Sequence, residues 1–185
     1  QGLSFVIPSD YVGKYIRLKV SSVENDEMIS QAIVNGDFET DVTISNSSSN
    51  SFTPTGWTEN GNNVTILVNG IDSNYLGNSN TENNSMIGFR GGRKLYQEIT
   101  GYKGFYTLTF DLIKRTVGSA STLLEPTINV LINNEVKLDE QVSNETIEQR
   151  TITWFNDEEI IRIEFATTGN EDKTFFIDNV AVSYI

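Results

Sequence analysis

The stretch GFYTLTFDLIKR, residues 104–115, alternates between apolar and mostly polar side chains. An extended chain places its side chains on two sides: Tyr106, Leu108, Phe110 and Leu112 against Phe105, Thr107, Thr109 and Asp111. Because successive side chains of a β-strand point to opposite faces of a sheet, this period of two predicts a strand with one buried face.

The same period recurs along most of the chain. In EIIRIEFATT, residues 159–168, the isoleucines and Phe165 alternate with Arg162 and Glu164. INVLINNEVKLDEQV, residues 128–142, predicts two strands joined by a tight turn at Asn133-Asn134, since asparagine tolerates positive φ. About ten such segments without crossover helices predict an all-β antiparallel jelly-roll β-sandwich. The expected buried set is Phe38, Trp57, Leu108, Phe110, Ile161, Ile163, Phe165, Phe176 and Val180.

Two parts of unequal length are expected. Residues 1–31 form an N-terminal β-hairpin or the end of a separate repeat, with an acidic joint VENDEM at 23–28. Residues 32–185 form the jelly-roll ligand-binding domain. The chain begins at Gln1 without an export signal, so we expect it to be a segment of a longer protein.

The residue composition excludes several classes of function. The net charge of −12 opposes binding to nucleic acid or to an anionic membrane, and favours divalent cations. No apolar run is long enough to insert into a membrane. The chain has no Cys and no His, which removes disulfides, thiolate metal sites and the usual catalytic base. No compact pair of acids suggests a glycosidase, so we expect no enzymatic activity.

Four motifs follow the order seen in one family. IVNGDFET (33–40), GWT (56–58), LYQEITGYKGFYTLTFDL (95–112) and FFIDNVAVSYI (175–185) resemble bacterial carbohydrate-binding modules of the galactose-binding-like jelly-roll type. SDYVGKYIRLKVSS (9–22) is similar to the end of a bacterial immunoglobulin-like repeat, as in large surface adhesins. The resemblance implies a monomeric recognition module in a longer protein, located outside the cell or on the bacterial surface.

A calcium site is also implied by this resemblance. In such modules a Glu of the first strand and an Asp of the last strand, here Glu39 and Asp178, hold one structural calcium together with nearby backbone carbonyls. A first strand ending at Val34 would turn at Asn35-Gly36, sending Phe38 into the core. Calcium accepts many oxygen ligands in irregular geometry, and further candidates are Asp37 and Asp72. The alternative is that Glu39 and Asp178 only bond backbone amides at strand ends.

Candidate ligand-binding residues cluster in GFRGGRKLYQE, residues 88–98. Sugar recognition needs aromatic rings for the apolar ring face and planar polar groups for paired hydroxyls. The candidates are Arg90, Arg93, Tyr96, Gln97, Arg115 and, as an exposed aromatic platform, Tyr75. The alternative to a ligand-binding role is that these arginines form ion pairs with surface carboxylates such as Glu98 or Asp111. Trp57 is expected in the core rather than at the ligand.

The composition and the resemblance together predict a non-catalytic, calcium-dependent binding module. Its ligand is most simply a carbohydrate on a target cell surface. A second interpretation is an adhesin domain that captures a peptide or protein terminus through arginine or calcium. A third, a structural spacer, leaves the segment from Arg90 to Gln97 unexplained.

Overall fold

The computed structural model describes residues 33–41, 53–60, 65–70, 75–81, 84–168 and 172–185. Within these ranges, ten strands form two five-stranded antiparallel sheets, which confirms the predicted all-β sandwich. The predicted N-terminal unit, residues 1–31, lies outside the described residues. The described part contains no helix long and apolar enough to cross a membrane.

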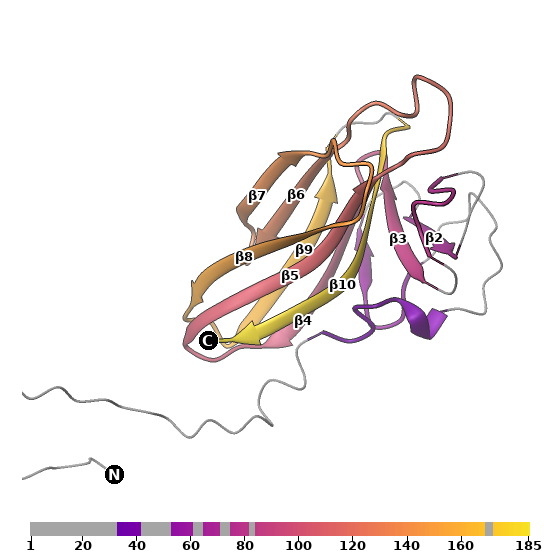
Figure 1. Ribbon diagram of the computed structural model, residues 1–185. Helices are drawn as coiled ribbons and strands as arrows, with labels where there is room; N and C mark the ends of the chain where they lie inside the picture. The colour runs from indigo at the N-terminus through magenta and orange to yellow at the C-terminus, as the bar shows by residue number, and fades with distance from the viewer. Residues whose placement is uncertain (1–32, 42–52, 61–64, 71–74, 82–83, 169–171) are drawn as a thin grey trace, which may run out of the picture.

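The chain passes back and forth between the two layers of the sandwich, except at β2–β3 and β6–β7, where consecutive strands share a sheet. Sheet A has the order β1-β4-β9-β6-β7, and sheet B has the order β2-β3-β10-β5-β8. Figure 1 shows β8, β5 and β10 side by side in one layer and β7, β6 and β9 in the other. The bounds in sheet A are β1 Thr58–Asn60, β4 Lys94–Thr100, β9 Ile160–Thr167, β6 Thr127–Ile132 and β7 Glu135–Gln141. Those in sheet B are β2 Thr65–Asn69, β3 Ser85–Arg90, β10 Thr174–Tyr184, β5 Gly104–Lys114 and β8 Glu148–Asn156.

The main core fills the space between the sheets. The apolar side of β5, from Tyr106 to Leu112, is buried there as the alternation predicts. All nine residues expected to be buried are buried. Phe176, however, belongs to a second and smaller core rather than to the main one.

The second core lies on the outer side of sheet B. Residues 75–81 supply Tyr75 and Leu76, which pack against side chains of β2, β3, β5 and β10: Val68, Met86, Ile113 and Phe176. Gly88 of β3 permits this packing, because a Cβ there would lie 2.4 Å from the Phe176 ring. This part of the outer surface of sheet B is therefore covered.

The first described segment is a turn and not a strand. Asn35 has a positive φ of 51°, and the 3₁₀ helix η3, Glu39–Asp41, follows. The strand expected to end at Val34 is not seen at residues 33–34, because the backbone of Val34 is bonded by the Gln97 side chain instead of by a neighbouring strand. The Val180 N–H donates to the Gly36 carbonyl at 2.9 Å, so the turn lies against β10. The first described segment and the last strand are thus close together.

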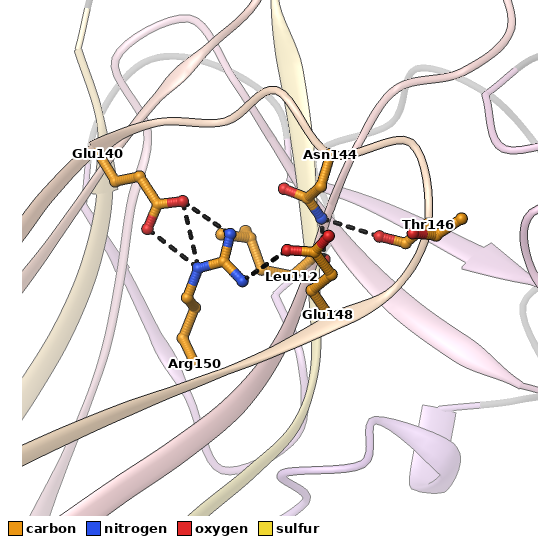
Figure 2. Close-up of polar contacts among 6 residues, drawn as sticks. All are labelled: Leu112, Glu140, Asn144, Thr146, Glu148 and Arg150. Carbon is orange, nitrogen blue, oxygen red and sulfur yellow. Dashed lines mark hydrogen bonds and ion pairs between the residues drawn. The ribbon is translucent and has the colours of Figure 1, made fainter.

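One edge of the sandwich is tied across the two sheets. Arg150 of β8 makes a two-pronged ion pair with Glu140 of β7, with a shortest distance of 2.7 Å. Figure 2 shows this pair beside Asn144, whose amide donates to the carbonyls of Leu112 and Thr146. These contacts fix the connection that crosses from sheet A to sheet B. The predicted hairpin at Asn133-Asn134 is confirmed, with positive φ at both residues.

Candidate functional site

A charged cluster lies on the outer side of sheet A, where β4 and β9 pair. Tyr96 is opposite Glu164 in the register, and Glu98 is opposite Arg162. Their neighbours Leu95 and Ile99 point into the core, so the charged side chains point outward. We call this cluster face A, made up of Lys94, Tyr96, Glu98, Arg162 and Glu164.

The guanidinium group of Arg162 is held flat on face A. Its carbon lies 3.5 Å from the centroid of the Tyr96 ring, a cation–π contact. One terminal nitrogen donates to Glu164 at 2.7 Å, and the other lies 3.9 Å from Glu98. A planar group fixed by a ring and two carboxylates loses little further freedom when a ligand binds.

Glu164 is the buried member of face A. Its side chain is only 5% exposed, and Lys94 donates at 2.9 Å to the carboxylate oxygen that Arg162 does not contact. Burial acts to raise its pKa, but the hydrogen bonds and charges of Lys94 and Arg162 outweigh burial and leave the pKa below its usual value. Glu164 is therefore ionised at neutral pH, and is not a proton donor.

Of the predicted ligand residues, Tyr96 lies on face A but Gln97 does not. Gln97 is buried, and its side-chain oxygen accepts from the Val34 N–H at 2.7 Å. Its nitrogen donates to the carbonyls of Val34 and Gly56. Gln97 is therefore not presented beside Tyr96 on the outer side of sheet A, because strand parity turns its side chain inward, where it anchors the first segment.

Arg93 is also turned away from solvent. Its side chain is 4% exposed and donates to Glu59 of β1 at 3.0 Å. Thr53 donates to the same carboxylate oxygen. The alternative that this arginine pairs with a carboxylate is thus confirmed, but the partner is Glu59 rather than Glu98 or Asp111.

Arg90, Arg115 and Tyr75 meet at the far end of sheet B. Arg90 and Arg115 approach the same oxygen of Asp172, at 2.8 and 3.5 Å. The Arg115 guanidinium lies 4.6 Å from the Tyr75 ring centroid. Tyr75 is 6% exposed because its ring packs on Phe176, so the expected exposed platform is wrong. The predicted ligand residues are therefore spread over several places.

The two predicted calcium ligands do come together. Asp178 of β10 is 1% exposed, and the carboxylates of Glu39 and Asp111 are near enough to act on it electrostatically. Glu39 accepts from the Ser85 N–H at 2.6 Å, and Asp178 accepts from the Asn179 N–H at 2.6 Å. Both backbone contacts expected from the alternative interpretation are thus present as well.

Asp178 has an unfavourable environment for a carboxylate. Burial raises its pKa to about 7, and the negative charges of Asp111 and Glu39 raise it further. Hydrogen bonds from Asn179 and Asn84 act in the opposite direction and lower the pKa. Within the described ranges, no Lys or Arg forms an ion pair with Glu39, Asp111 or Asp178. A bound cation would supply the missing positive charge, so these residues fit the ion that the resemblance implies.

Side chains alone do not complete a metal site here. Among the residues that the structure describes, no group of three or more acids is placed to hold a metal ion. An ion at Asp178 would therefore need carbonyl or water ligands too. Asp37 is exposed and accepts from the Glu39 N–H at 3.3 Å, at the start of η3. Asp72 lies outside the described residues.

Sequence reasoning did not predict four of the five members of face A as ligand residues: Lys94, Glu98, Arg162 and Glu164. The sequence did contain a signal for two of them, because the alternation in β9 places Arg162 and Glu164 on the same, polar side of the strand. Their approach to Tyr96 depends on β4 pairing with β9, more than sixty residues later in the chain. Local periodicity does not report such a pairing.

No protein-family model matches the sequence, and no curated protein matches it. Among solved structures, the fold is similar to the carbohydrate-binding module TmCBM61, solved in complex with β-1,4-galactotriose, at a TM-score of 0.56 and 15% identity. This match covers 84% of this chain and 99% of that one.

The K1 cleaved adhesin domain of Lys-gingipain from Porphyromonas gingivalis W83 is similar at a TM-score of 0.52 and 11% identity. That match covers 71% of this chain and 92% of the adhesin domain. The enzymatically active domain of tailspike protein 4 from bacteriophage CBA120 is similar at 0.50 and 15%. That match covers 84% of this chain but 21% of the tailspike chain. These likenesses show a carbohydrate-binding-module-like β-sandwich.

Proposed function

We propose that this chain is a non-catalytic carbohydrate-binding module whose glycan lies across face A. The observation that carries the proposal is the Arg162 guanidinium, stacked on Tyr96 and tied to Glu164 on an outward sheet surface. The fold is that of a module solved with a bound galactotriose, which supports the same class of ligand.

The chemistry of face A suits sugar hydroxyls. Glu98 and Lys94 are 52% and 45% exposed at the side chain, and provide an acceptor and a donor on either side of the Arg162–Tyr96 stack. Two cations and two carboxylates make the cluster neutral overall, so it does not require a charged ligand. Neutral sugars with paired hydroxyls match this arrangement.

A binding role is favoured over hydrolysis. Glycoside hydrolysis needs one carboxylic acid that keeps its proton at working pH. The lowered pKa of Glu164 works against that role, and the chain has no His or Cys. Similarity to a tailspike domain identifies no catalytic residue in this chain, because the match spans a small share of the tailspike protein.

Calcium is proposed as a structural ion held by Asp178 and Glu39. The support is the buried, negatively surrounded Asp178 carboxylate and its position on β10, the strand against which the first segment lies. When bound, the ion would neutralise these carboxylates and fix the turn that carries Phe38 into the core. The ion would support the fold and would not take part in a reaction.

The biological setting is proposed as a monomeric module in a secreted or surface-located bacterial adhesin. The support is the resemblance of residues 9–22 to an immunoglobulin-like repeat, together with structural similarity to an adhesin domain. That similarity also favours the second candidate, binding of a protein or peptide terminus. The half-exposed Arg90 is the residue that could hold a terminal carboxylate.

A glycan array probed beside a peptide-terminus library, each with calcium and with chelator, separates the two candidates. Binding to one or more glycans that is reduced by chelator supports the primary proposal. Binding confined to peptide termini supports the second. Binding to neither in the presence of calcium contradicts both.

A further inference from the structure

An uncharged surface lies on the outer side of sheet B, away from the part covered by the second core. Three paired strands, β10, β5 and β8, contribute outward side chains to it. We call it face B, made up of Phe105, Thr107, Thr109, Thr151, Thr153, Phe155, Ala181 and Ser183. None of these eight side chains is charged, although charged residues make up 21% of the chain.

Two phenylalanine rings dominate face B. Phe105 and Phe155 are opposite each other in the register, with ring centroids 5.1 Å apart at 70°. They are 54% and 49% exposed, while the residues beside them in sequence, Tyr106 and Trp154, are buried. Because Tyr106 and Trp154 supply the core contacts, the exposed rings are left available to a partner.

Hydroxyl groups continue the surface beyond the rings. The next row across the strands contains Thr107 and Thr153, whose hydroxyl oxygens lie 3.5 Å apart, and Ser183 lies beside Thr107. Nine consecutive residue pairs join β5 and β8 without a register shift, whereas β10 pairs with β5 through a register shift between Asp178 and Ala181. The β5–β8 part of face B is therefore an even surface of aromatic rings and short hydroxyls.

We infer that face B docks on the surface of a neutral, insoluble polysaccharide. Such a surface presents apolar C–H faces, which suit Phe105 and Phe155, and hydroxyls, which suit the threonine rows. The outward row of β5 carries one charged side chain, Asp111, which lies past the threonine rows and opposite Gln149, and a polyanion would be repelled by the net charge of −12. The inference rests on the proposed function for the ligand class, but it uses a different sheet.

This assignment gives the module two separate contacts with glycan. Face A lies on β4 and β9 of sheet A, and face B lies on β5, β8 and β10 of sheet B. The two faces are on opposite outer surfaces of the sandwich. One molecule could therefore lie on an insoluble particle through face B while face A holds a soluble chain.

The experiment measures depletion of the protein from solution by microcrystalline β-1,4-glucan, insoluble β-1,3-glucan and chitin particles. The variants are the double substitution Phe105→Ala with Phe155→Ala, and Thr153→Glu, which places a charge in face B and keeps both rings. Leu124→Ala is the matched control, because Leu124 is 52% exposed but lies outside both sheets. Arg162→Lys reports on face A, and thermal melting confirms that each variant is folded.

We expect depletion by at least one particle, a partition constant about tenfold lower for the double variant and for Thr153→Glu, and no change for Leu124→Ala. Absence of depletion by every particle overturns the inference, as does equal depletion of the wild type and the face B variants. A dimer in solution that the double variant converts to a monomer, without a change in depletion, assigns face B to self-association and also overturns it. Loss of depletion in Arg162→Lys alone assigns the contact to face A.

Discussion

The guanidinium carbon of Arg162 lies 3.5 Å from the centroid of the Tyr96 ring, across the pairing of β9 with β4. The same arginine donates to the buried carboxylate of Glu164, which Lys94 bonds as well. One ring, two cations and a carboxylate are thus linked on an outward surface. The rigidity of this cluster is what makes it suitable for recognition rather than only for solubility.

Tyr96→Ala should weaken glycan binding without unfolding the protein. The ring restrains Arg162, and we expect a loss of about 0.5 to 2 kcal/mol of binding free energy when this cation–π contact is removed. Tyr96 is half-buried on the outside of the sheet, so the melting temperature should change little. Titration calorimetry with the strongest array ligand measures the effect. Unchanged affinity would show that the stack does not contribute to binding.

Gln97→Ala should show the opposite pattern. The Gln97 amide makes three hydrogen bonds to the backbone of Val34 and Gly56, and its removal leaves buried groups without these partners. We expect the free energy of unfolding to fall by about 2 to 4 kcal/mol, while the folded protein keeps its glycan affinity. Urea denaturation measures the fall. If the variant is as stable as the wild type but has lost glycan affinity, Gln97 contributes to the binding site, which contradicts this prediction.

Trp57→Ala should be strongly destabilising. Its indole is 5% exposed, packs near Phe38 and Phe165, and donates to the Asn35 carbonyl at 3.2 Å. Loss of a buried ring of this size costs about 3 to 5 kcal/mol. Thermal melting checks this, with Trp57→Phe as a milder control. A change below about 1 kcal/mol would contradict the core assignment.

Stability should depend on pH through Asp178, and calcium should offset part of this dependence. Its pKa is about 7 in the folded state against 3.8 for the ordinary group, so the folded state binds more protons between these values. In chelator, the contribution of Asp178 to stability is therefore favourable below pH 3.8 and is lost as the pH rises through 7, by about 4 kcal/mol at most.

Calcium in hundredfold excess over Kd should restore about 2.7 kcal/mol at pH 8. Asp178→Asn removes the buried charge, so in chelator this variant should be at least as stable as the wild type at pH 8 and should gain nothing from calcium. Melting curves at pH 5 and 8, with calcium and with chelator, give all the comparisons. A wild-type melting curve that calcium leaves unchanged, with no metal found by elemental analysis, would remove the calcium proposal.

The fold could be predicted from the sequence because its determinants are local. The alternation in β5 and the Asn133-Asn134 turn each act over a few residues, and both are found as expected. The candidate site could be predicted only in part. Gln97 lies on the same side of β4 as the buried Leu95 and Ile99, so strand periodicity alone places it inward. Its polar side chain nevertheless favoured a ligand-binding role in the sequence interpretation.

The arginines depend on partners far away in the sequence. Arg93 pairs with Glu59, and Arg90 pairs with Asp172. These pairings follow from how the strands are ordered in the sheets, which periodicity does not specify. Glu39 and Asp178 were located through a resemblance, and their meeting across the domain could not be deduced from spacing alone.

The most direct test of the central claim compares two arginine-to-lysine substitutions. Arg162→Lys keeps the positive charge beside Glu164 but loses the flat, stacked guanidinium of face A. Arg150→Lys is the matched control at the β7–β8 edge (Figure 2), since the two side chains are 25% and 22% exposed and both pair with two glutamates. In titration calorimetry with the strongest array glycan, we predict that Arg162→Lys weakens binding about tenfold while Arg150→Lys matches the wild type. Equal affinity for all three proteins would contradict glycan binding on face A.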